Sequence, residues 1–548
     1  MKTIRIVLAQ SNFLVGDIEG NAHKIIDLCA QARQRHQADL ILFPELALVG
    51  YPPEDLLLRK DLYLRCQRAI KDIQQQVGDF YVVMGIPLRD DLGNEKGMYN
   101  AALVLHQQQI IARYNKQALP NYSVFDEKRY FIAGDEPCVV DIAGVPMGIT
   151  ICEDIWVEAP VQRSVAAGAR MILNINASPY HLRKDAERHQ VVRDHIHKYA
   201  VPIAYVNQIG GQDELVFDGA SFVLNANAEC MFQAPAFEED LYPVELHVTN
   251  NSVSVPQQTC APVLSEEESA YRALVTGVRD YVRKNNFNGV VIGLSGGIDS
   301  ALTLAIVVDA IGAEGVEGVL MPSRYTSTMS VEDAKQECHT LGVAYDLISI
   351  EPAFITFMEM LKEAFAGMPV DTTEENIQAR CRGLILMAIA NKKRKIAMTT
   401  GNKSEMAVGY ATLYGDMAGG FDVLKDVSKT LVYRLARWRN REKEIIPQRV
   451  IDRPPSAELA PDQKDSDSLP DYAVLDPILM RYVELDQSPE DIIAAGFDEA
   501  TVRRVIRLVD GAEHKRRQAP PGVRITPRAF GRDRRYPLTS GYHRHRQK

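Results

Sequence analysis

Short runs of Val, Ile and Leu alternate with polar and amphipathic stretches along the whole chain of 548 residues. In the first half the short apolar runs are typical of buried strands, and helical periodicity predicts helices over 21–37 and 161–167. The strand-like runs are TIRIVLAQ, ADLILFPEL, FYVVMGIP, AALVLHQQQIIARYN, PMGITICED, ARMILNIN and PIAYVNQIG. This pattern predicts an α/β domain with a layered sheet core over residues 1–252.

The pattern changes near residue 260. Residues 253–268 are rich in Pro, Gln, Ser and Glu and have little apolar periodicity, so they predict a linker. A helical pattern then leads into VVIGLSGGIDSALTLAIVVDAIG, and the strands VEGVLMP and RKIAMTT alternate with helices over 331–341 and 376–391. The alternation predicts a doubly wound parallel sheet in a second domain, residues 269–548.

Composition and charge narrow the class of protein. The chain is 46% hydrophobic and 24% charged, as in ordinary globular proteins, and its net charge of −10 argues against a general binder of nucleic acid or membranes. No run approaches the roughly 20 apolar residues of a membrane span, and MKTIRIVLAQSNF lacks the apolar region of a signal peptide. The eight cysteines include no CxxC pair. We therefore expect a cytoplasmic protein with no nucleic-acid or membrane partner.

Two segments of the second half are polar. Residues 453–472 are rich in Pro and Asp and predict a loop. From Lys515 onward the chain carries eleven Lys or Arg residues and one acid, Asp533. Two interpretations of this basic tail stay open: it is solvated, or it meets an anionic ligand or a neighbouring subunit.

Three reactive side chains stand where apolar strands end. Glu45 ends LILFPE, Lys116 ends IIARYNK and Cys152 ends GITIC, and strand ends are where α/β sheets usually bind ligands. An ammonium favours the thiolate and stabilises an oxyanion, while a carboxylate accepts the thiol proton and later activates water. A single cysteine after a strand is more often a core residue, so the prediction depends on all three. Together they predict thiolate attack on an amide, giving a thioester and free ammonia.

The surroundings of these residues resemble the nitrilase superfamily. The segments FPELALVGYPPEDLL, RYNKQALPNYSVFDEKRYF and GITICEDIW carry the resemblance, which covers roughly residues 1–250. It implies an α-β-β-α sandwich with Glu45, Lys116 and Cys152 as catalytic residues. It also implies a glutamine-binding set in which one member, Glu127, supports the triad: Tyr122, Glu127, Ser178 and Lys184.

The string VVIGLSGGIDSALTLAIV predicts a strand, a glycine-rich turn and a helix. Glycines let backbone N–H groups approach a phosphate, and a helix N-terminus favours an anion, although a glycine pair is also often only a tight turn. The string lacks the lysine of a GxxxxGK[ST] loop, and an acid beside polyphosphate indicates Mg²⁺ at Asp299. The predicted ATP-binding loop comprises Gly293, Leu294, Ser295, Gly296, Gly297, Ile298, Asp299 and Ser300.

SGGIDS resembles the PP-loop, or ATP pyrophosphatase, family, whose members form adenylated intermediates. The stretch ENIQARCRGLILMAIANKKRKIAMTTGNKSEMAVGYATLYGDMAGGFDVLKDVSKTLVYRLA and the tail AEHKRRQAPPGVRITPRAFGRDRRYP resemble glutamine-dependent NAD synthetases. The resemblance implies a ligase that uses ATP to amidate deamido-NAD⁺ to NAD⁺ through an adenylate, giving AMP, diphosphate and L-glutamate. Cys152 would release ammonia from L-glutamine, and an internal channel would carry it to the second site.

The same resemblance assigns residues of the second site. Asp299 and Glu405 would bind Mg²⁺, and ATP would contact Thr400, Lys429 and Arg324, which lies in the segment MPSRYTST. Taken singly, Arg324 and Lys429 are equally typical of surface charges. The set implied for deamido-NAD⁺ is Asn376, Glu405, Asp416 and Lys515. RPPSAELAPDQKDSDSLPDY resembles a loop that orders over this site, and its composition suits a mobile lid.

The resemblance also implies a homo-oligomer of unknown symmetry. Three alternatives stay open for the function: an amidotransferase of another PP-loop type with a different acceptor, a plain amidase beside a degenerate binding module, and a nucleotide-sensing scaffold without turnover. The stretch TGNKSE and the later YGD favour deamido-NAD⁺ as the acceptor. Assays of glutamine and ATP with each candidate acceptor distinguish these functions.

Overall fold

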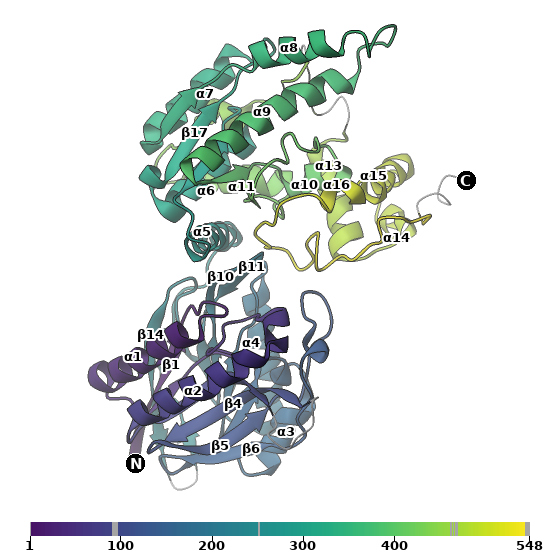
Figure 1. The fold of residues 1–548 in the computed structure, drawn as a ribbon. Coiled ribbons are helices and arrows are strands. Elements are labelled where there is room, and N and C mark those ends of the chain that lie inside the picture. The colour runs from purple at the N-terminus through teal and green to yellow at the C-terminus, as the bar shows by residue number, and fades with distance from the viewer. Residues whose placement is uncertain are drawn as a thin grey trace. The chain divides into compact units, whose positions relative to one another are not determined.

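The fold is described by a computed structural model, which covers residues 2–89, 97–249, 252–456, 458–460, 463, 465 and 469–542. The chain forms two compact units: unit 1 is Met1–Gln212 with Val216–Leu264, and unit 2 is Asp213–Leu215 with Ser265–Lys548. Figure 1 colours the chain from purple at the N-terminus to yellow at the C-terminus. Among the described residues, no helix has both the length and the apolar character needed to cross a membrane.

Unit 1 is built on two large sheets, of seven strands in the order β15-β14-β1-β2-β3-β4-β5 and of six in the order β13-β12-β9-β8-β7-β6. The strands of the first sheet are β1 (Lys2–Gln10), β2 (Leu40–Leu42), β3 (Tyr81–Arg89), β4 (Met98–His106), β5 (Gln109–Asn115), β14 (Asp240–Val248) and β15 (Val253–Ser254). Those of the second are β6 (Cys138–Ile142), β7 (Val145–Ile151), β8 (Met171–Asn176), β9 (Ile203–Asn207), β12 (Phe222–Leu224) and β13 (Cys230–Gln233). A separate pair consists of β10 (Ile209–Gln212) and β11 (Leu215–Asp218).

The main core of unit 1 lies between its two sheets. Ile4, Ile6 and Leu8 alternate along β1 and share one buried cluster with Met147 and Ile149 of β7, because every second side chain of a strand faces the same way. Helices cover the outer faces, α1 (Ile18–His36) and α2 (Lys60–Val77) on the first sheet and α3 (Glu158–Ala166) and α4 (Lys184–Tyr199) on the second (Figure 1). The short 3₁₀ turns are η1 (Glu54–Leu58), η2 (Glu127–Arg129) and η3 (Cys152–Ile155). The expected α-β-β-α sandwich is confirmed.

One strand expected from the sequence is wrong. The run AALVLHQQQIIARYN forms a hairpin of β4 and β5, which turns at Gln107 and Gln108 with φ of 49° and 61°. Positive φ at two successive residues is the geometry of a type I′ turn, which usually requires Asn or Gly. Two glutamines carry no such signal, so the turn was not visible in the sequence.

Unit 2 contains a five-stranded parallel sheet in the order β18-β17-β16-β19-β20. Its strands are β16 (Val290–Gly293), β17 (Val316–Leu320), β18 (Ala344–Leu347), β19 (Ile396–Thr399) and β20 (Phe421–Asp422). The helices up to residue 439 are α5 (Glu266–Lys284), α6 (Ile298–Ile311), η4 (Ala313–Gly315), α7 (Thr328–Leu341), α8 (Glu351–Leu361), α9 (Thr372–Lys393), α10 (Lys403–Val408) and α11 (Lys429–Arg439). The strand order reverses beside β16, so the predicted doubly wound sheet is confirmed, with its switch point between β16 and β19.

The C-terminal part of unit 2 is a helical layer with its own buried cluster. It comprises α12 (Gln448–Asp452), α13 (Tyr472–Leu479), the π-helical turn η6 (Met480–Glu484), α14 (Pro489–Ala494), α15 (Glu499–Gly511) and α16 (Glu513–Arg516). In the basic tail, Arg516, Arg524 and Arg534 are buried and pair with acids of the same unit: Glu513, Asp533 and Asp510. A wholly solvated tail is therefore the wrong interpretation up to Arg534, whereas most of residues 535–542 are exposed, and residues 543–548 lie outside the described part.

Candidate functional site

The fold brings together the three strand-end residues of unit 1. Glu45 follows β2 in the loop after residue 42, Lys116 follows β5 directly, and Cys152 follows β7 as the first residue of η3. All three side chains are buried, and two come from one sheet while the third comes from the other. The sandwich thus places an acid, a base and a thiol at one end of its core.

A network of hydrogen bonds surrounds Lys116. Its Nζ donates to Glu45 Oε1 at 2.7 Å and to both oxygens of Glu127 at 2.8 and 2.9 Å. Asn100 Nδ2 also donates to Glu45 Oε1, at 2.7 Å, and the Tyr51 hydroxyl donates to Glu127 at 3.1 Å. Asn100 was not identified from the sequence, because nothing in its segment distinguishes it from other strand residues. The network fixes both carboxylates relative to one ammonium.

Burial and charge act in opposite directions on this network. Burial disfavours the ammonium, but the carboxylates of Glu127 and Glu45 hold the pKa of Lys116 well above its usual range. Burial raises the pKa of Glu127 to about 7, while the charge of Lys116 opposes that rise. Lys116 therefore remains an ammonium within a dry site, where its field is strong.

Cys152 lies at a sharp turn, and its thiol is buried. Its φ of 44° is in the left-handed region, which is unusual for a residue other than glycine. Burial raises the pKa of this thiol well above its usual range, the charge of Glu45 raises it further, and Lys116 opposes both. The thiol therefore needs a base to become a nucleophile, and Glu45 is the carboxylate with the largest effect on its pKa.

Charged groups of both signs lie near Cys152. The hydroxyl of Tyr122, which is 57% exposed, donates to the Glu153 carboxylate at 3.0 and 3.1 Å. Lys184 begins α4, and its Nζ lies 3.8 Å from the centroid of the Trp156 ring. Burial raises the pKa of Glu153 and lowers that of Lys184. Glu153 was missed from the sequence, although its place directly after Cys152 was a usable signal.

Ser178 is buried and held from two sides. Its N–H donates to Asn207 Oδ1 at 2.9 Å, and its Oγ accepts from Arg188 Nε at 3.1 Å. Arg188 of α4 also donates to both oxygens of Asp218 at 2.8 Å. This buried ion pair fixes the loop around Ser178, and neither partner was identified from the sequence.

In unit 2 the glycine-rich loop joins β16 to α6 at the switch point of the sheet. Gly296 has a φ of 76°, and a Cβ atom there would lie 2.1 Å from the carbonyl oxygen of Ser330, so only glycine fits. Ser295 Oγ accepts from Gly297 N at 3.1 Å, and Ser300 Oγ donates to Gly297 O at 3.0 Å. The loop is thus held by its own hydroxyls at the start of α6.

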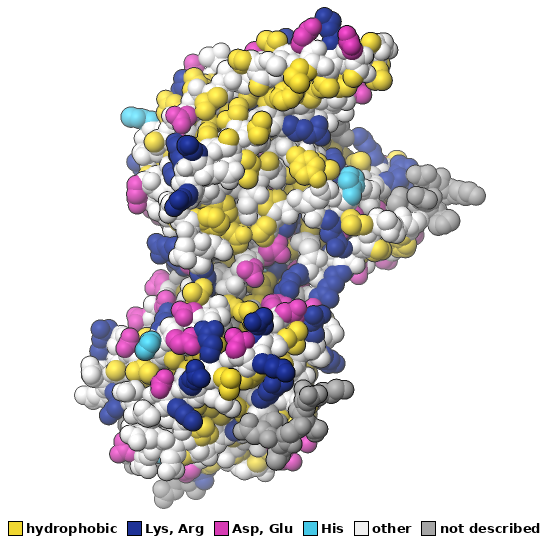
Figure 2. All heavy atoms as spheres, in the orientation of Figure 1, with side chains coloured by type: hydrophobic (Ala, Val, Ile, Leu, Met, Phe, Trp, Pro, Cys, Tyr) yellow, Lys and Arg dark blue, Asp and Glu magenta, His cyan; other side chains and the backbone are white. Residues whose placement is uncertain are grey.

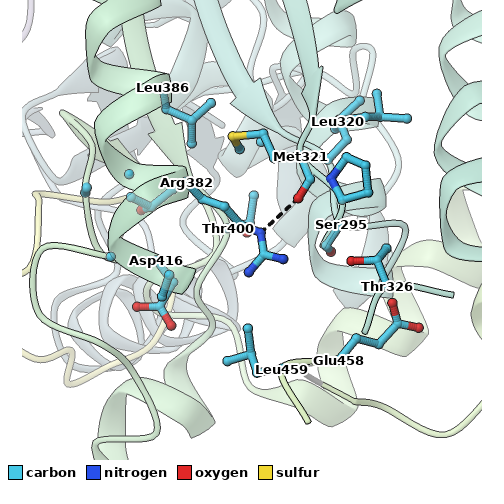
Figure 3. A pocket seen from close by; sticks show the side chains of 18 of the residues that line it. Ser295, Leu320, Met321, Thr326, Arg382, Leu386, Thr400, Asp416, Glu458 and Leu459 are labelled. Atoms are coloured by element: carbon cyan, nitrogen blue, oxygen red, sulfur yellow. Dashed lines mark hydrogen bonds between the residues drawn. The ribbon is translucent and has the colours of Figure 1, made fainter. Parts of the chain in front are cut away.

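Two cavities meet at this loop. The first, of about 240 Å³, has mostly apolar walls and is lined by residues that include Met321, Leu386, Thr400 and Leu459. Figure 3 shows Arg382 in its wall, with Nε donating to Met321 O at 3.1 Å, and Glu458 and Asp416 on opposite sides. The second cavity, of about 200 Å³, is lined by charged residues and shares Ser295, Asp416 and Glu458 with the first.

Three predicted residues form a cluster in the second cavity. Lys429 Nζ donates to Asp299 Oδ2 at 2.5 Å and to Glu405 Oε1 at 3.0 Å, and Asn402 Nδ2 donates to Asp299 Oδ1 at 2.9 Å. Burial raises the pKa of Glu405 to about 7, although Lys429 opposes the rise. Burial works against the ammonium of Lys429, but the two carboxylates hold its pKa above the usual range.

Asp299 and Glu405 suit a Mg²⁺ ion that arrives with a nucleotide. Among the described residues no group of three or more His, Cys, Asp or Glu side chains could hold a metal ion. Mg²⁺ is usually held by one or two carboxylates together with phosphate oxygens, which is what this pair offers. The pair therefore fits the expected ion, with part of its coordination supplied by the substrate.

The other predicted residues of unit 2 lie in different surroundings. Asn376 and Asp416 both accept hydrogen bonds from Thr412, at 2.9 and 2.7 Å. Lys515 donates to carbonyl oxygens of the segment that follows α10, at 2.7 and 2.8 Å. Arg324 pairs with Glu351 and is half exposed. Of these four residues only Asp416 lines the two cavities, and Asn376, Lys515 and Arg324 line neither of them.

The segment predicted as a lid lies against the start of α7. Glu458 accepts from Ser327 N at 3.3 Å, from Ser327 Oγ at 3.0 Å and from Ser330 Oγ at 2.7 Å. Arg453 donates to Ser330 Oγ at 2.9 Å. Residues 457, 461–462, 464 and 466–468 of this segment lie outside the described part. The described residues of the segment contribute walls to both cavities.

Known proteins share both halves of this architecture. Residues 4–250 match the carbon-nitrogen hydrolase family, and residues 270–519 match the NAD synthase family. The glutamine-dependent NAD(+) synthetases of Acinetobacter baylyi and Thermotoga maritima are 48% and 45% identical to the chain, each with 99% of both chains covered. The solved glutamine-dependent NAD+ synthetase of Acinetobacter baumannii, in complex with ADP, is 46% identical over 99% of both chains, with a TM-score of 0.80. The chain therefore belongs to the glutamine-dependent NAD(+) synthetases.

Proposed function

We propose that the two sites divide one reaction, in which unit 1 frees ammonia from L-glutamine and unit 2 joins it to deamido-NAD⁺. Membership of the family makes the chain a ligase that forms NAD⁺, and its full-length relatives do not favour a different acceptor. The division itself rests on one observation, the buried network that joins Lys116 to Glu45 and Glu127 beside the buried Cys152. The domains are proposed as 1–252 for the glutaminase and 269–548 for the synthetase, with 253–268 as the linker.

The glutaminase mechanism follows from the charges around Cys152. Glu45 takes the thiol proton, and the thiolate attacks the amide carbon of glutamine. The ammonium of Lys116 stabilises the oxyanion, and the C–N bond breaks as Glu45 returns the proton to the departing ammonia. Glu45 then activates water, which hydrolyses the thioester to glutamate and frees Cys152.

Charges near Cys152 match the zwitterionic end of glutamine. The Glu153 carboxylate is the counterpart of an ammonium, and Lys184 is the counterpart of a carboxylate. Tyr122 and Ser178 complete the proposed set, with Glu127 holding Lys116 in place. A glutamine analogue without its α-ammonium is expected to bind far more weakly to this site than glutamine.

In unit 2 we place ATP in the two joined cavities, consistent with the ADP complex of the relative from Acinetobacter baumannii. The apolar cavity suits the adenine ring, and the loop at Ser295 suits the phosphates. Asp299 and Glu405 would hold Mg²⁺, which neutralises phosphate charge when it is bound. Lys429 balances the charge that builds on the leaving diphosphate. We propose that Asp416, in the wall of both cavities, and Asn376, linked to it through Thr412, contact deamido-NAD⁺.

The decisive experiment compares two nitrogen donors in one enzyme. Cys152→Ala is expected to abolish NAD⁺ formation from glutamine and to retain NAD⁺ formation from an ammonium salt. Both rates are measured with ATP and deamido-NAD⁺ by following NAD⁺ and AMP. Loss of both activities in a folded variant would contradict the division of labour between the units.

We also propose that ammonia passes to the adenylate through an internal channel. Free ammonia in neutral water is mostly ammonium, which is not a nucleophile, so transfer away from bulk solvent preserves its reactivity. With unlabelled glutamine and ¹⁵N-ammonium in solution, the NAD⁺ formed is expected to carry nitrogen from glutamine. Extensive ¹⁵N incorporation at low ammonium concentration would contradict the channel.

The proposed state in solution is a cytoplasmic homo-oligomer. Support comes from apolar side chains exposed on α8 and α9, among them Met360 and Leu384. Figure 2 shows hydrophobic side chains gathered on the visible face of unit 2. The edge strand β18 adds the exposed Tyr345 and Leu347. Light scattering is expected to show that Met360→Glu with Leu384→Glu lowers the molar mass, and an unchanged mass would move the interface elsewhere.

A further inference from the structure

Asp154 lies two residues after Cys152 and is fully buried. Its Oδ1 accepts from the backbone N–H groups of Gln117 and Ala118, at 3.0 and 2.8 Å. Its Oδ2 accepts from the Tyr114 hydroxyl at 2.8 Å and from the N–H of Ile151 at 2.9 Å. All four hydrogen bonds have normal lengths, so both oxygens of the carboxylate are well occupied.

These four donors flank the proposed catalytic residues. Gln117, Ala118 and Tyr114 lie on either side of Lys116, at the end of β5, and Ile151 directly precedes Cys152 at the end of β7. The two strands belong to different sheets of the sandwich. One carboxylate thus joins the two sheets at the place where the ammonium and the thiol are presented.

Local capping of η3 does not account for this arrangement. The bond from Ile151 N is sufficient to cap the turn, whereas the three other bonds reach a segment more than thirty residues earlier in the chain. The turn itself is strained, since Cys152 has a φ of 44°, and such a conformation persists only when its surroundings hold it. The carboxylate therefore restrains both ends of the site.

We propose that Asp154 is a positioning residue for glutamine hydrolysis, which sets the separation of the Lys116 ammonium and the Cys152 thiol by clamping β5 to β7. The inference rests on the proposed roles of those two residues. Burial raises the pKa of Asp154 to about 6, and the backbone N–H donors oppose the rise, so the group is mainly an ionised acceptor at neutral pH. A misplacement of about 1 Å between reacting groups is enough to lower a rate about 10²-fold.

Asp154→Asn tests the clamp with little change of shape. The amide keeps one acceptor oxygen but turns the other into a donor, which then faces an N–H or O–H donor. We expect kcat for glutamine hydrolysis to fall by about 10²-fold, while the KM for glutamine and the ammonia-driven rate stay near their original values. Alkylation of Cys152 by iodoacetamide, followed by mass spectrometry of its peptide, is expected to slow as well.

Two further variants decide between positioning and general stability. Tyr114→Phe removes one donor and should give a smaller fall in kcat with the same KM, so it carries the test if Asp154→Asn does not fold. Val244→Ala shortens a buried side chain of β14 in the same core, and Val244 takes no part in these hydrogen bonds. An equal fall in kcat for Val244→Ala at matched loss of thermal stability would overturn the proposal.

Cys152→Ala separates this proposal from the function on which it rests. If Cys152→Ala still hydrolyses glutamine, the assignment of the nucleophile fails. If Cys152→Ala is inactive while folded Asp154→Asn or Tyr114→Phe keeps the original kcat, the positioning role fails and the assignment of the nucleophile stands.

Discussion

In each unit a buried lysine lies between two carboxylates, but the two clusters differ in how far they are open. The side chains of Lys116, Glu45 and Glu127 in unit 1 are 0%, 0% and 6% exposed. The corresponding side chains in unit 2 are those of Lys429, Asp299 and Glu405, at 2%, 16% and 19%. The second cluster forms part of the wall of the cavity of about 200 Å³.

The difference indicates two kinds of site. In unit 1 the charges satisfy one another and are aimed at a thiol that is part of the chain, so the site is preorganised without a ligand. In unit 2 the lysine neutralises two carboxylates that face a cavity. A Mg²⁺ ion that arrives with a nucleotide would add further positive charge to the same two carboxylates. A glutaminase nucleophile can be built in, whereas an adenylation site must leave room for charge that arrives with ATP.

The sharpest test replaces both lysines. Lys116→Met is expected to lower the glutamine-driven rate by about 10²- to 10³-fold, because the oxyanion loses its charged partner, and to leave the ammonia-driven rate intact. Lys429→Met should lower both rates by a similar factor. Steady-state assays with each nitrogen donor measure this contrast, and an effect of Lys116→Met on the ammonia-driven rate would break it.

Removing Lys116 should also destabilise unit 1. Two buried carboxylates would lose their counter-ion, which typically costs about 3–5 kcal/mol. Lys429→Met should destabilise unit 2 less, since its carboxylates can reach solvent through the cavity. Thermal unfolding of the two variants measures which unit loses more stability. Equal falls in melting temperature would mean that the two clusters are equally shielded from water.

The open cluster should respond to Mg²⁺ and the closed one should not. Glu405→Gln is expected to lower NAD⁺ formation from either donor by roughly 10²-fold and to raise the Mg²⁺ concentration needed for half-maximal rate, while glutamine hydrolysis persists. Glu127→Gln is the matched control in unit 1, with no expected change in Mg²⁺ dependence. The rate of NAD⁺ formation is measured as a function of Mg²⁺ concentration at fixed ATP. Identical curves for Glu405→Gln and the unmodified enzyme would exclude Glu405 as a Mg²⁺ ligand.

The glycine loop offers a backbone test of the ATP site. Gly296→Ala combines a positive φ with a contact 2.1 Å from Ser330 O, and we expect the KM for ATP to rise by about tenfold or more, equivalent to about 1.4 kcal/mol. Gly342→Ala is the control, because Gly342 has a φ of 73° but no atom within 4 Å of the added Cβ. It should lose roughly 1 kcal/mol of stability and leave the KM for ATP unchanged. An equal rise in KM for both variants would point to general strain.

The smallest expected effect concerns pH. Glu127 and Glu405 each have a pKa raised from 4.5 to about 7, so each adds stability that is present below pH 4.5 and lost as the pH rises through about 7. Glu127→Gln should reduce the fall in the stability of unit 1 with rising pH, by at most about 1.4 kcal/mol per pH unit. Glu405→Gln should have the same effect on unit 2. Asp154, Asp416 and Asp422 have pKa values shifted the same way and leave a residual slope. Thermal unfolding from pH 4.5 to 7.5 measures the slopes, and unchanged slopes would contradict these shifts.

Much of this arrangement was visible along the chain. Apolar runs located the central strands of both units, and helical periodicity located some of their helices, among them α1, α7 and α9. The rule that ligands meet strand ends singled out Glu45, Lys116 and Cys152. The hairpin at Gln107 and Gln108 escaped because its turn uses no residue that favours positive φ. The burial of the tail arginines was not predicted, because a charged side chain is expected to be exposed unless its acidic partner is known.

The sequence by itself determined which chemistry this protein carries: a thiol, an acid and a base after apolar strands, and a glycine-rich loop before a helix. Only the tertiary structure decided the partners. Asn100, Asp154 and Asn402 act through contacts with residues 37 to 103 positions away, and such contacts leave no periodic trace in a single chain. Only a few residue types can perform a given reaction, so reactive residues can be recognised in a sequence. Many residue types can hold them in place, and which ones do so depends on the positions that the packed sheets give them.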